Sequence, residues 1–451
     1  MIVNKKTLSS LTEEERKLVD ILIKIVRIAD DIYKEQTNSK YPGGNLYPHD
    51  TTREEFDQAA IRDPELRRFD TVVERVSASE YKAVPYTKKY QKKISQMVDL
   101  LKEALKYATE PSFRIYLKAM IACFEEGSQE AYRHMVTAWV KTKDYHINFP
   151  LGYDELYVDR LMGLKGSFDV ALFIEDDELT PLILRPIKMR KEFVETLNLP
   201  DDAYIYPSLS PAVYKTIAVG GMSADMKARA WNTPDDPQAR REAGARQIVI
   251  KETISEMFDK ELRPILRETD LCGGQDFSKE QLRNGIFWTI AMHEVCHNIG
   301  NYRDHKKLEK YAAVYEELKN YILPIIWLFF CNENKTCNIS DIKAAICAYL
   351  ASSLSGAVLG EKIRARESYT LATLIHFNFM QKQGAIDIHG PEIKINFDKL
   401  VPVNREIFDE IISIMESGSY DRAQRYAKLY GDREPLEEVF KVARKYTNTD
   451  V

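Results

Sequence analysis

The spacing of apolar residues predicts a chain that is mostly helical. After Thr12, which forms a capping box with Glu15, apolar residues recur at helical spacing up to Ile32. A threonine pair at 51–52, followed by two glutamates, predicts the start of a second, shorter helix. Residues 90–141 contain few helix breakers, so we expect further helices there.

The pattern changes after residue 142, where short β segments are expected. Residues 167–174 mix β-branched and aromatic residues and predict a strand, and residues 247–250 predict another. Residues 179–234 are punctuated by Pro, Gly and Ser, which predicts loops and short strands around a site. Residues 386–397 alternate in polarity around a Gly-Pro turn, which predicts a hairpin.

Apolar helices are expected on both sides of residue 300. One covers residues 253–267. A capping box of Ser278 and Gln281 opens the next, which is expected to run to Gly300.

The helices that follow complete a mainly α chain. Asp304 can cap a helix that Pro324 bends or ends, and a further helix covers about 340–380. After the predicted hairpin, the C-terminal residues return to a helical pattern. The expected fold class is therefore mainly α with a small β component (α+β).

Composition is that of an ordinary soluble globular protein. The chain has 451 residues, enough for two or three lobes, with 44% hydrophobic and 29% charged residues. A net charge of −5 argues against nucleic acid as a partner. The apolar run at 321–331 is too short to span a bilayer and no secretory signal is visible, so we expect a cytoplasmic protein without membrane contact. The six cysteines form no Cys-x-x-Cys pair and are expected to be free thiols.

The strongest chemical signal is an H-E-x-x-H motif at His293-Glu294-Val295-Cys296-His297. Two histidines four residues apart lie on one face of a helix and can reach one ion. Glu294 can point into the same cavity and deprotonate a metal-activated water. The alternative is a helix with two partly exposed histidines, but the residues at 286–292 are mostly apolar, and buried histidines need partners.

A further ligand is expected from Glu316-Glu317. Glu317 lies 20 residues after His297, which is room for a turn and an antiparallel helix. The helix around the pair is apolar, so an unpaired carboxylate there would be costly. Two imidazoles and one carboxylate, with a position left for water, are typical of a catalytic zinc site. The pattern does not choose between the two glutamates; the other one can hydrogen-bond a ligand histidine.

Several segments together resemble the dipeptidyl peptidase III family of zinc metallopeptidases, especially its shorter bacterial members. HEVCH at 293–297 and YEELK at 315–319 resemble the family's paired motifs. Residues 231–236 resemble its N-x-P-N segment, and residues 152–160 resemble its G-x-x-E-x-Y-x-D segment. The resemblance spans most of the chain and includes Asn45–Pro48, Ala83–Tyr86 and Phe377–Phe379.

The resemblance implies a role for each matching residue. One zinc ion would be bound by His293, His297 and Glu317. Glu294 would activate water as the general base, and Glu316 would orient a ligand histidine. The residues expected to contact substrate are Asn232, Asp235, Glu155, Tyr157 and Tyr369.

Three positions depart from the family pattern. Phe149-Pro150 stands where many members have a tyrosine that steadies the tetrahedral intermediate, and Tyr369 falls at the position of a family histidine. Tyr321 replaces the acidic residue that closes the second motif. Loss of one oxyanion donor typically costs about 10²- to 10³-fold in rate. The metal ligands and the base are kept, whereas the stabilising groups differ.

The resemblance also implies two lobes separated by a cleft, one helical and zinc-bearing, the other built on a small β-barrel. We expect residues 1–260 to form N-terminal helices and a β-containing substrate lobe. Residues 261–380 would form the helical zinc-binding lobe, and residues 381–451 a hairpin and helices that pack back on the lobes.

The favoured function is zinc-dependent hydrolysis of short peptides or peptide-like amides, with release of dipeptides from the N-terminus as the preferred mode. Two alternatives stay open. The replaced stabilisers favour a specialised non-peptidase reaction of the same zinc site on a small metabolite. A metal-bearing binding protein with weak or no catalysis is the other, although such a protein has no evident need for Glu294.

Overall fold

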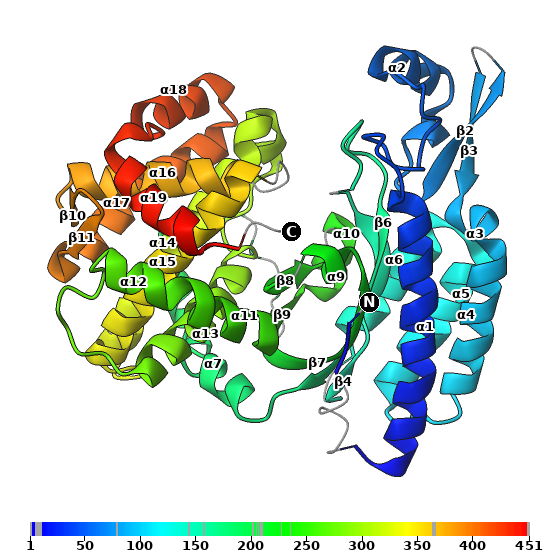
Figure 1. Cartoon of the computed structure of the whole chain (residues 1–451), viewed down its shortest axis with the longest axis horizontal. Coiled ribbons are helices and arrows are strands. Elements are labelled where there is room, and N and C mark those ends of the chain that lie inside the picture. The colour runs from blue at the N-terminus through cyan, green and yellow to red at the C-terminus, as the bar shows by residue number, and fades with distance from the viewer. Residues whose placement is uncertain are drawn as a thin grey trace. The chain divides into compact units, whose positions relative to one another are not determined.

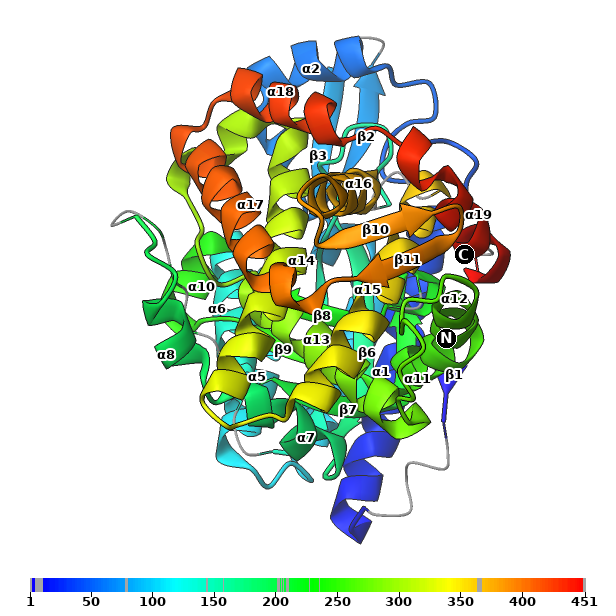
Figure 2. The same ribbon diagram turned by 90° about the vertical axis from the view of Figure 1, so that its left-hand side faces the viewer.

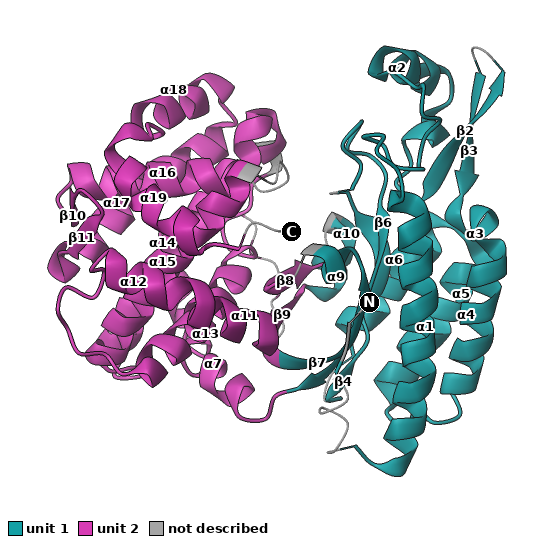
Figure 3. Cartoon of the chain, viewed as in Figure 1, with its two compact units in different colours: residues 1–175, 214–228, 234–244 teal, residues 176–213, 229–233, 245–451 magenta. Residues whose placement is uncertain are grey.

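The computed structural model divides the chain into two compact units (Figure 3). Unit 1 contains residues 1–175, 214–228 and 234–244, and unit 2 contains residues 176–213, 229–233 and 245–451. The residues described are 2–4, 11–77, 80–142, 145–156, 158–200, 203, 205, 207, 211–226, 228–234, 236–362 and 367–448.

Unit 1 is built on the long helix α1 (Glu13–Thr37), which packs against strand β6 (Ser167–Glu175) (Figure 1). Thr12 caps α1 and forms the predicted capping box with Glu15. Thr52 caps α2 (Arg53–Arg62) in the same way. The helices predicted for residues 90–141 are confirmed as α4 (Gln91–Ala104), α5 (Pro111–Glu126) and α6 (Gln129–Val140). Unit 1 also contains the short helices α3 (Tyr86–Lys89), α9 (Met222–Met226) and α10 (Pro237–Ala243).

Strand β6 pairs antiparallel with three neighbours in unit 1. These are β4 (Ile147–Asn148), β5 (Leu151–Glu155) and the unit 1 part of β7 (Ala212–Gly221), and β7 in turn pairs with β1 (Ile2–Val3). A separate hairpin, β2 (Thr71–Ser77) with β3 (Glu80–Pro85), was not predicted from the sequence.

The prediction of loops and short strands for residues 179–234 was partly wrong. The described part of this segment contains three helices, α7 (Leu179–Ile187), α8 (Arg190–Glu195) and α9, together with the ten-residue strand β7. Leu179, Ile183 and Ile187 are buried at helical spacing in α7, and this apolar face outweighs the prolines that suggested a loop. The stretch around Asn232 lies in the short strand β8 (Ala230–Thr233), in agreement with the predicted short strands.

Unit 2 is mainly helical and contains two antiparallel strand pairs. Strand β8 pairs antiparallel with β9 (Arg246–Ile250), and β10 (Ile386–His389) pairs with β11 (Glu392–Ile395), as predicted. Its other helices are α11 (Lys251–Met257), α12 (Arg263–Glu268), α13 (Lys279–Cys296), α14 (Lys310–Glu333), α15 (Ile339–Lys362), α16 (Glu367–Lys382), α17 (Phe397–Ser417), α18 (Tyr420–Tyr430) and α19 (Glu437–Tyr446).

Three boundaries in unit 2 correct the sequence predictions. Helix α13 ends at Cys296 rather than Gly300, so His297 is its C-cap. Helix α14 begins at Lys310 after a 3₁₀ turn at Arg303–Leu308, and it continues through Pro324 instead of ending there. The helix predicted for 340–380 is two helices, α15 and α16.

Helices α13, α14 and α15 pack together, and α14 and α15 run side by side in Figure 2. In the described chain one segment, Ile339–Glu361 of α15, is long and apolar enough to cross a membrane. Inside the protein, 83% of its most apolar window is buried, as in the core helix of a globular protein.

Gly285 allows α13 to approach α15 closely. A Cβ at this position would lie 2.4 Å from the Cα of Ala345, a backbone atom that cannot yield alone. Gly285→Ala should therefore destabilise the protein by about 1–3 kcal/mol, because overpacking forces the helices apart. Gly356→Ala in α15 is the matched control. Its Cβ would meet nothing nearer than the Tyr321 hydroxyl at 3.6 Å, and alanine should stabilise the helix by about 0.5–1 kcal/mol. Urea unfolding measures both, and equal effects at the two positions would contradict the close approach.

Candidate metal centre

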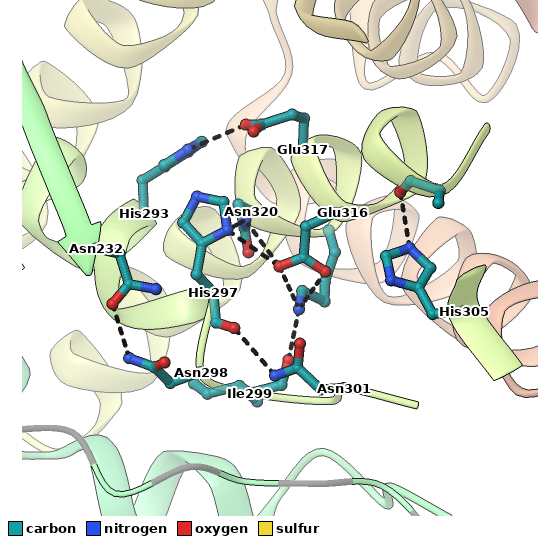
Figure 4. Close-up of polar contacts among 12 residues, drawn as sticks. Asn232, His293, His297, Asn298, Ile299, Asn301, His305, Glu316, Glu317 and Asn320 are labelled. Carbon is teal, nitrogen blue, oxygen red and sulfur yellow. Dashed lines mark hydrogen bonds and ion pairs between the residues drawn. The ribbon is translucent and has the colours of Figure 1, made fainter. Parts of the chain in front are cut away.

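Helices α13 and α14 bring His293, His297 and Glu317 together. One possible ligand atom from each residue lies within 4.8 Å of the other two. The two imidazole rings are nearly perpendicular, with centroids 5.2 Å apart (Figure 4). His293 and Glu317 are buried, at 7% and 8% exposure, so a charge here is poorly solvated.

The neighbours of His293 determine which of its two ring nitrogens carries the hydrogen. Nδ1 lies 2.9 Å from the hydroxyl of Tyr349, and that hydroxyl donates its hydrogen to the backbone carbonyl of Asn320 at 2.7 Å. A hydroxyl that has donated its one hydrogen can only accept, so Nδ1 of His293 must carry the hydrogen. Nε2 therefore presents a lone pair.

That lone pair faces another acceptor. Nε2 of His293 lies 3.2 Å from Oε2 of Glu317, and this carboxylate oxygen makes no hydrogen bond to any described residue. Two buried acceptors at this distance repel unless a cation lies between or beside them. A proton or a metal ion can supply that charge. With a second imidazole within reach, the donor set of two nitrogens and one oxygen fits a metal such as zinc.

His297 is oriented by Glu316. Its Nδ1 donates to Oε1 of Glu316 at 3.0 Å and lies 2.8 Å from the side-chain amide of Asn320 (Figure 4). This leaves Nε2 of His297 directed to the metal position, the arrangement commonly seen in histidine ligands held by a carboxylate. Burial lowers the pKa of His297, but the hydrogen bond to Glu316 and the nearby charges of Glu317 and Glu294 raise it above the ordinary value. A proton and a metal ion therefore compete for this imidazole.

Lys319 keeps Glu316 ionised. Its fully buried ammonium donates to both carboxylate oxygens of Glu316 at 3.0 Å and to the carbonyl of Ile299 at 2.7 Å. Burial alone would raise the pKa of Glu316, but Lys319 and the hydrogen bond from His297 hold it well below its ordinary value.

A chain of amides starts beside the metal position. Gln247 donates through Nε2 to the carbonyl of Ala245 at 3.1 Å and to Oδ1 of Asn232 at 2.8 Å. Asn298, the residue after His297, donates to the same oxygen at 3.2 Å (Figure 4). Gln247 is directly opposite Asn232 on the β8–β9 pair. The backbone carbonyl thus fixes the direction of every amide in the chain.

The remaining predicted residues are placed as follows. Glu294 lies on α13 between the two histidines and is partly exposed. Tyr369, on α16, packs partly buried against the unit 2 core, whereas Glu155 ends strand β5 in unit 1. Asp235 and Tyr157 lie outside the described residues.

The departures from the family pattern are apolar or aromatic. Phe149 is fully buried in unit 1, and its backbone carbonyl accepts a hydrogen bond from Tyr116. The ring of Tyr321 lies 5.6 Å from that of His293 and 6.1 Å from that of Tyr349. The rings of Tyr321 and Tyr349 therefore lie beside His293, and Tyr321 stands where the family pattern has an acidic residue.

Sequence reasoning missed four residues around the centre: Lys319, Tyr349, Asn298 and Gln247. A signal existed for Lys319, because a lysine three residues after a glutamate on an apolar helix can pair with it. Tyr349 lies on another helix, 56 residues after His293, and no local spacing connects the two.

Removing the Lys319 ammonium should destabilise the protein. Lys319→Met leaves the mostly buried Glu316 carboxylate with hydrogen bonds from His297 and Asn320 but without the lysine charge, so we expect a loss of about 3–5 kcal/mol in unfolding free energy. Lys260→Met is the control, since Lys260 pairs with Glu256 on the surface and should change stability little. Urea unfolding of the metal-free proteins measures both. A wild-type midpoint for Lys319→Met would contradict the pairing.

Comparison with known proteins identifies relatives over most of the chain. The family model described as "Peptidase family M49" matches residues 65–320. The fold matches "DPP III from Caldithrix abyssi", with a TM-score of 0.83, 22% identity and coverage of 99% of this chain and 95% of the other. It also matches "dipeptidyl-peptidase III from Corallococcus sp. strain EGB", with a TM-score of 0.79, 17% identity and coverage of 99% and 93%.

A curated relative extends beyond this chain. "Nudix hydrolase 3" of Arabidopsis thaliana is 24% identical over 478 aligned positions, which include 93% of this chain and 60% of the relative's length. The mainly α fold with a small β component is confirmed by the matched structures, and so is the resemblance drawn from the two histidine and glutamate motifs. The chain belongs to peptidase family M49.

Proposed function

We propose that this protein is a zinc-dependent peptidase that hydrolyses short peptides or peptide-like amides. The observation that carries the proposal is the buried acceptor pair of His293 Nε2 and Glu317 Oε2, 3.2 Å apart, beside a second histidine. Membership of peptidase family M49 supports hydrolysis as the reaction. Release of dipeptides from a free amino terminus is the preferred mode, and one zinc ion the proposed cofactor.

Each residue of the centre receives a proposed role. His293, His297 and Glu317 would hold the ion, while Glu316 and Tyr349 orient the two imidazoles. Zinc, when bound there, would polarise the scissile carbonyl and lower the pKa of the attacking water. Glu294 would take the proton from that water as it attacks the carbonyl carbon and then pass it to the leaving amine.

Five residues are proposed as substrate contacts. Asn232 would bind the peptide close to the metal, since its oxygen is hydrogen-bonded to Asn298, the neighbour of ligand His297. Asp235, Glu155, Tyr157 and Tyr369 are proposed as further contacts. The phenol of Tyr369 can donate a hydrogen bond, so it is a candidate to replace the family histidine in stabilising the oxyanion.

A second candidate function rests on Phe149. Its side chain has no polar group and is fully buried, whereas the family resemblance implies a stabilising tyrosine at this position in many members. A zinc-dependent reaction on a small metabolite, with a less demanding oxyanion, would tolerate that change. We rank it below peptide hydrolysis.

Glu294→Gln tests the mechanism. The amide cannot accept the proton, so turnover should fall at least about 10²-fold while one bound zinc per chain remains. Peptidase assays and metal analysis on the same preparation measure the two properties. Glu280→Gln, on the exposed first turn of α13, is the control and should behave as wild type. Full activity of Glu294→Gln would contradict the proposed role of Glu294 as general base.

Dipeptidyl arylamides test the preferred substrate. Arylamides with a free amino terminus should be cleaved, whereas N-acetylated versions should resist, because the proposed mode requires the amino end. Chromophore release measures both. Absence of cleavage from any arylamide, together with turnover in a metabolite library, would favour the second candidate function instead.

A further inference from the structure

Helix α14 carries a proline in its interior, a position where proline normally destabilises a helix. Pro324 lies 14 residues into the 24-residue helix and is buried. Proline has no backbone N–H, so the helical hydrogen bond to the carbonyl four residues earlier, that of Asn320, cannot form. In an ordinary core helix this would leave a buried acceptor without its partner.

Tyr349 supplies the missing hydrogen. Its hydroxyl, on α15, donates to the carbonyl of Asn320 at 2.7 Å. The side chain is 3% exposed, so the phenol and the carbonyl satisfy each other out of contact with water. An alanine at position 324 would bring an N–H that competes for the same carbonyl.

The occupied hydroxyl then determines the state of His293. Because Tyr349 donates to Asn320, its oxygen accepts from Nδ1–H of His293 at 2.9 Å. The Nε2 lone pair of His293 is thereby directed to Glu317 and the metal position. We call this chain of hydrogen bonds, from the Asn320 carbonyl through Tyr349 to His293, the relay. Its three residues come from α14, α15 and α13.

We propose that Pro324 and Tyr349 are positioning residues for His293: the proline frees the Asn320 carbonyl, which orients the Tyr349 hydroxyl, which fixes His293 as an Nε2 ligand. The inference rests on the proposed function, in which His293 binds the metal. It assigns a role in metal binding to a proline that touches neither metal nor substrate. Partners that hold a ligand histidine in this way typically contribute about 10- to 100-fold to metal affinity.

The proline variant distinguishes this role from a merely structural one. Pro324→Ala restores a helical hydrogen bond and should raise the unfolding temperature of the metal-free protein. In the same variant the zinc affinity should fall about 10-fold or more, since the relay loses its orientation. Stability and affinity thus move in opposite directions. Pro402→Ala, in the interior of α17, is the control and should be stabilised without any change in zinc affinity.

The tyrosine variant has its own control. Tyr349→Phe should lower both the unfolding temperature and the zinc affinity, the latter about 10- to 100-fold. Tyr315→Phe removes an equally buried phenol that also donates to a backbone carbonyl, that of Ala423, at 2.7 Å. It should lower the unfolding temperature alone.

Zinc affinity is measured by competition with a chelator, and stability by thermal unfolding of the metal-free proteins. Wild-type affinity in both Pro324→Ala and Tyr349→Phe would overturn the inference while leaving the proposed function intact. If wild type binds no zinc, the proposed function fails, and crystal structures of the metal-free proteins decide the inference separately. Loss of the contact between Tyr349 and His293 in Pro324→Ala would support it, and an unchanged contact would overturn it.

Discussion

Two buried acceptors that face each other are the constraint on which this structure depends. Nε2 of His293 and Oε2 of Glu317 lie 3.2 Å apart, on two different helices, in a setting that poorly solvates charge. Neither atom has a hydrogen to give in this arrangement, so their proximity is favourable only with a cation. The surrounding groups maintain this arrangement. Tyr349 holds the hydrogen of His293 on Nδ1, and Lys319 keeps Glu316 ionised and able to orient His297.

The helices are packed to bring these atoms together. Gly285 lets α13 approach α15, the helix that carries Tyr349. Pro324 leaves the Asn320 carbonyl of α14 without a helical N–H partner, and Tyr349 donates to this carbonyl. Residues that look like defects in a helix, a glycine and a proline, thus lie at the points where the centre requires close approach or an available carbonyl. The geometry of the centre depends on the backbone as much as on the side chains that line it.

The sequence predicted the parts of this centre that follow from spacing within one helix. The H-E-x-x-H pair, the glutamate pair and the two predicted capping boxes at Thr12 and Ser278 are all local patterns, and helices begin where the boxes predicted. The α+β class and the resemblance to the dipeptidyl peptidase III family are confirmed.

What sequence reasoning could not supply depends on contacts between distant segments. Pro324 predicted a bend or an end of its helix, but α14 continues through it. The phenol that replaces the missing N–H comes from another helix, so the sequence around Pro324 does not reveal it. Residues 179–234 were predicted only as loops and short strands, because the pairing of Asn232 with Gln247 on the neighbouring strand has no local sequence signal. The prolines near α7 suggested a loop, since the burial of its apolar face is a property of the packed unit.

Anomalous X-ray scattering at the zinc absorption edge, from crystals grown with zinc, tests the central claim most directly. The account predicts one strong peak per chain, ligated by Nε2 of His293, Nε2 of His297 and a carboxylate oxygen of Glu317. A peak held by Glu316 in place of Glu317, or no peak between α13 and α14, would contradict it.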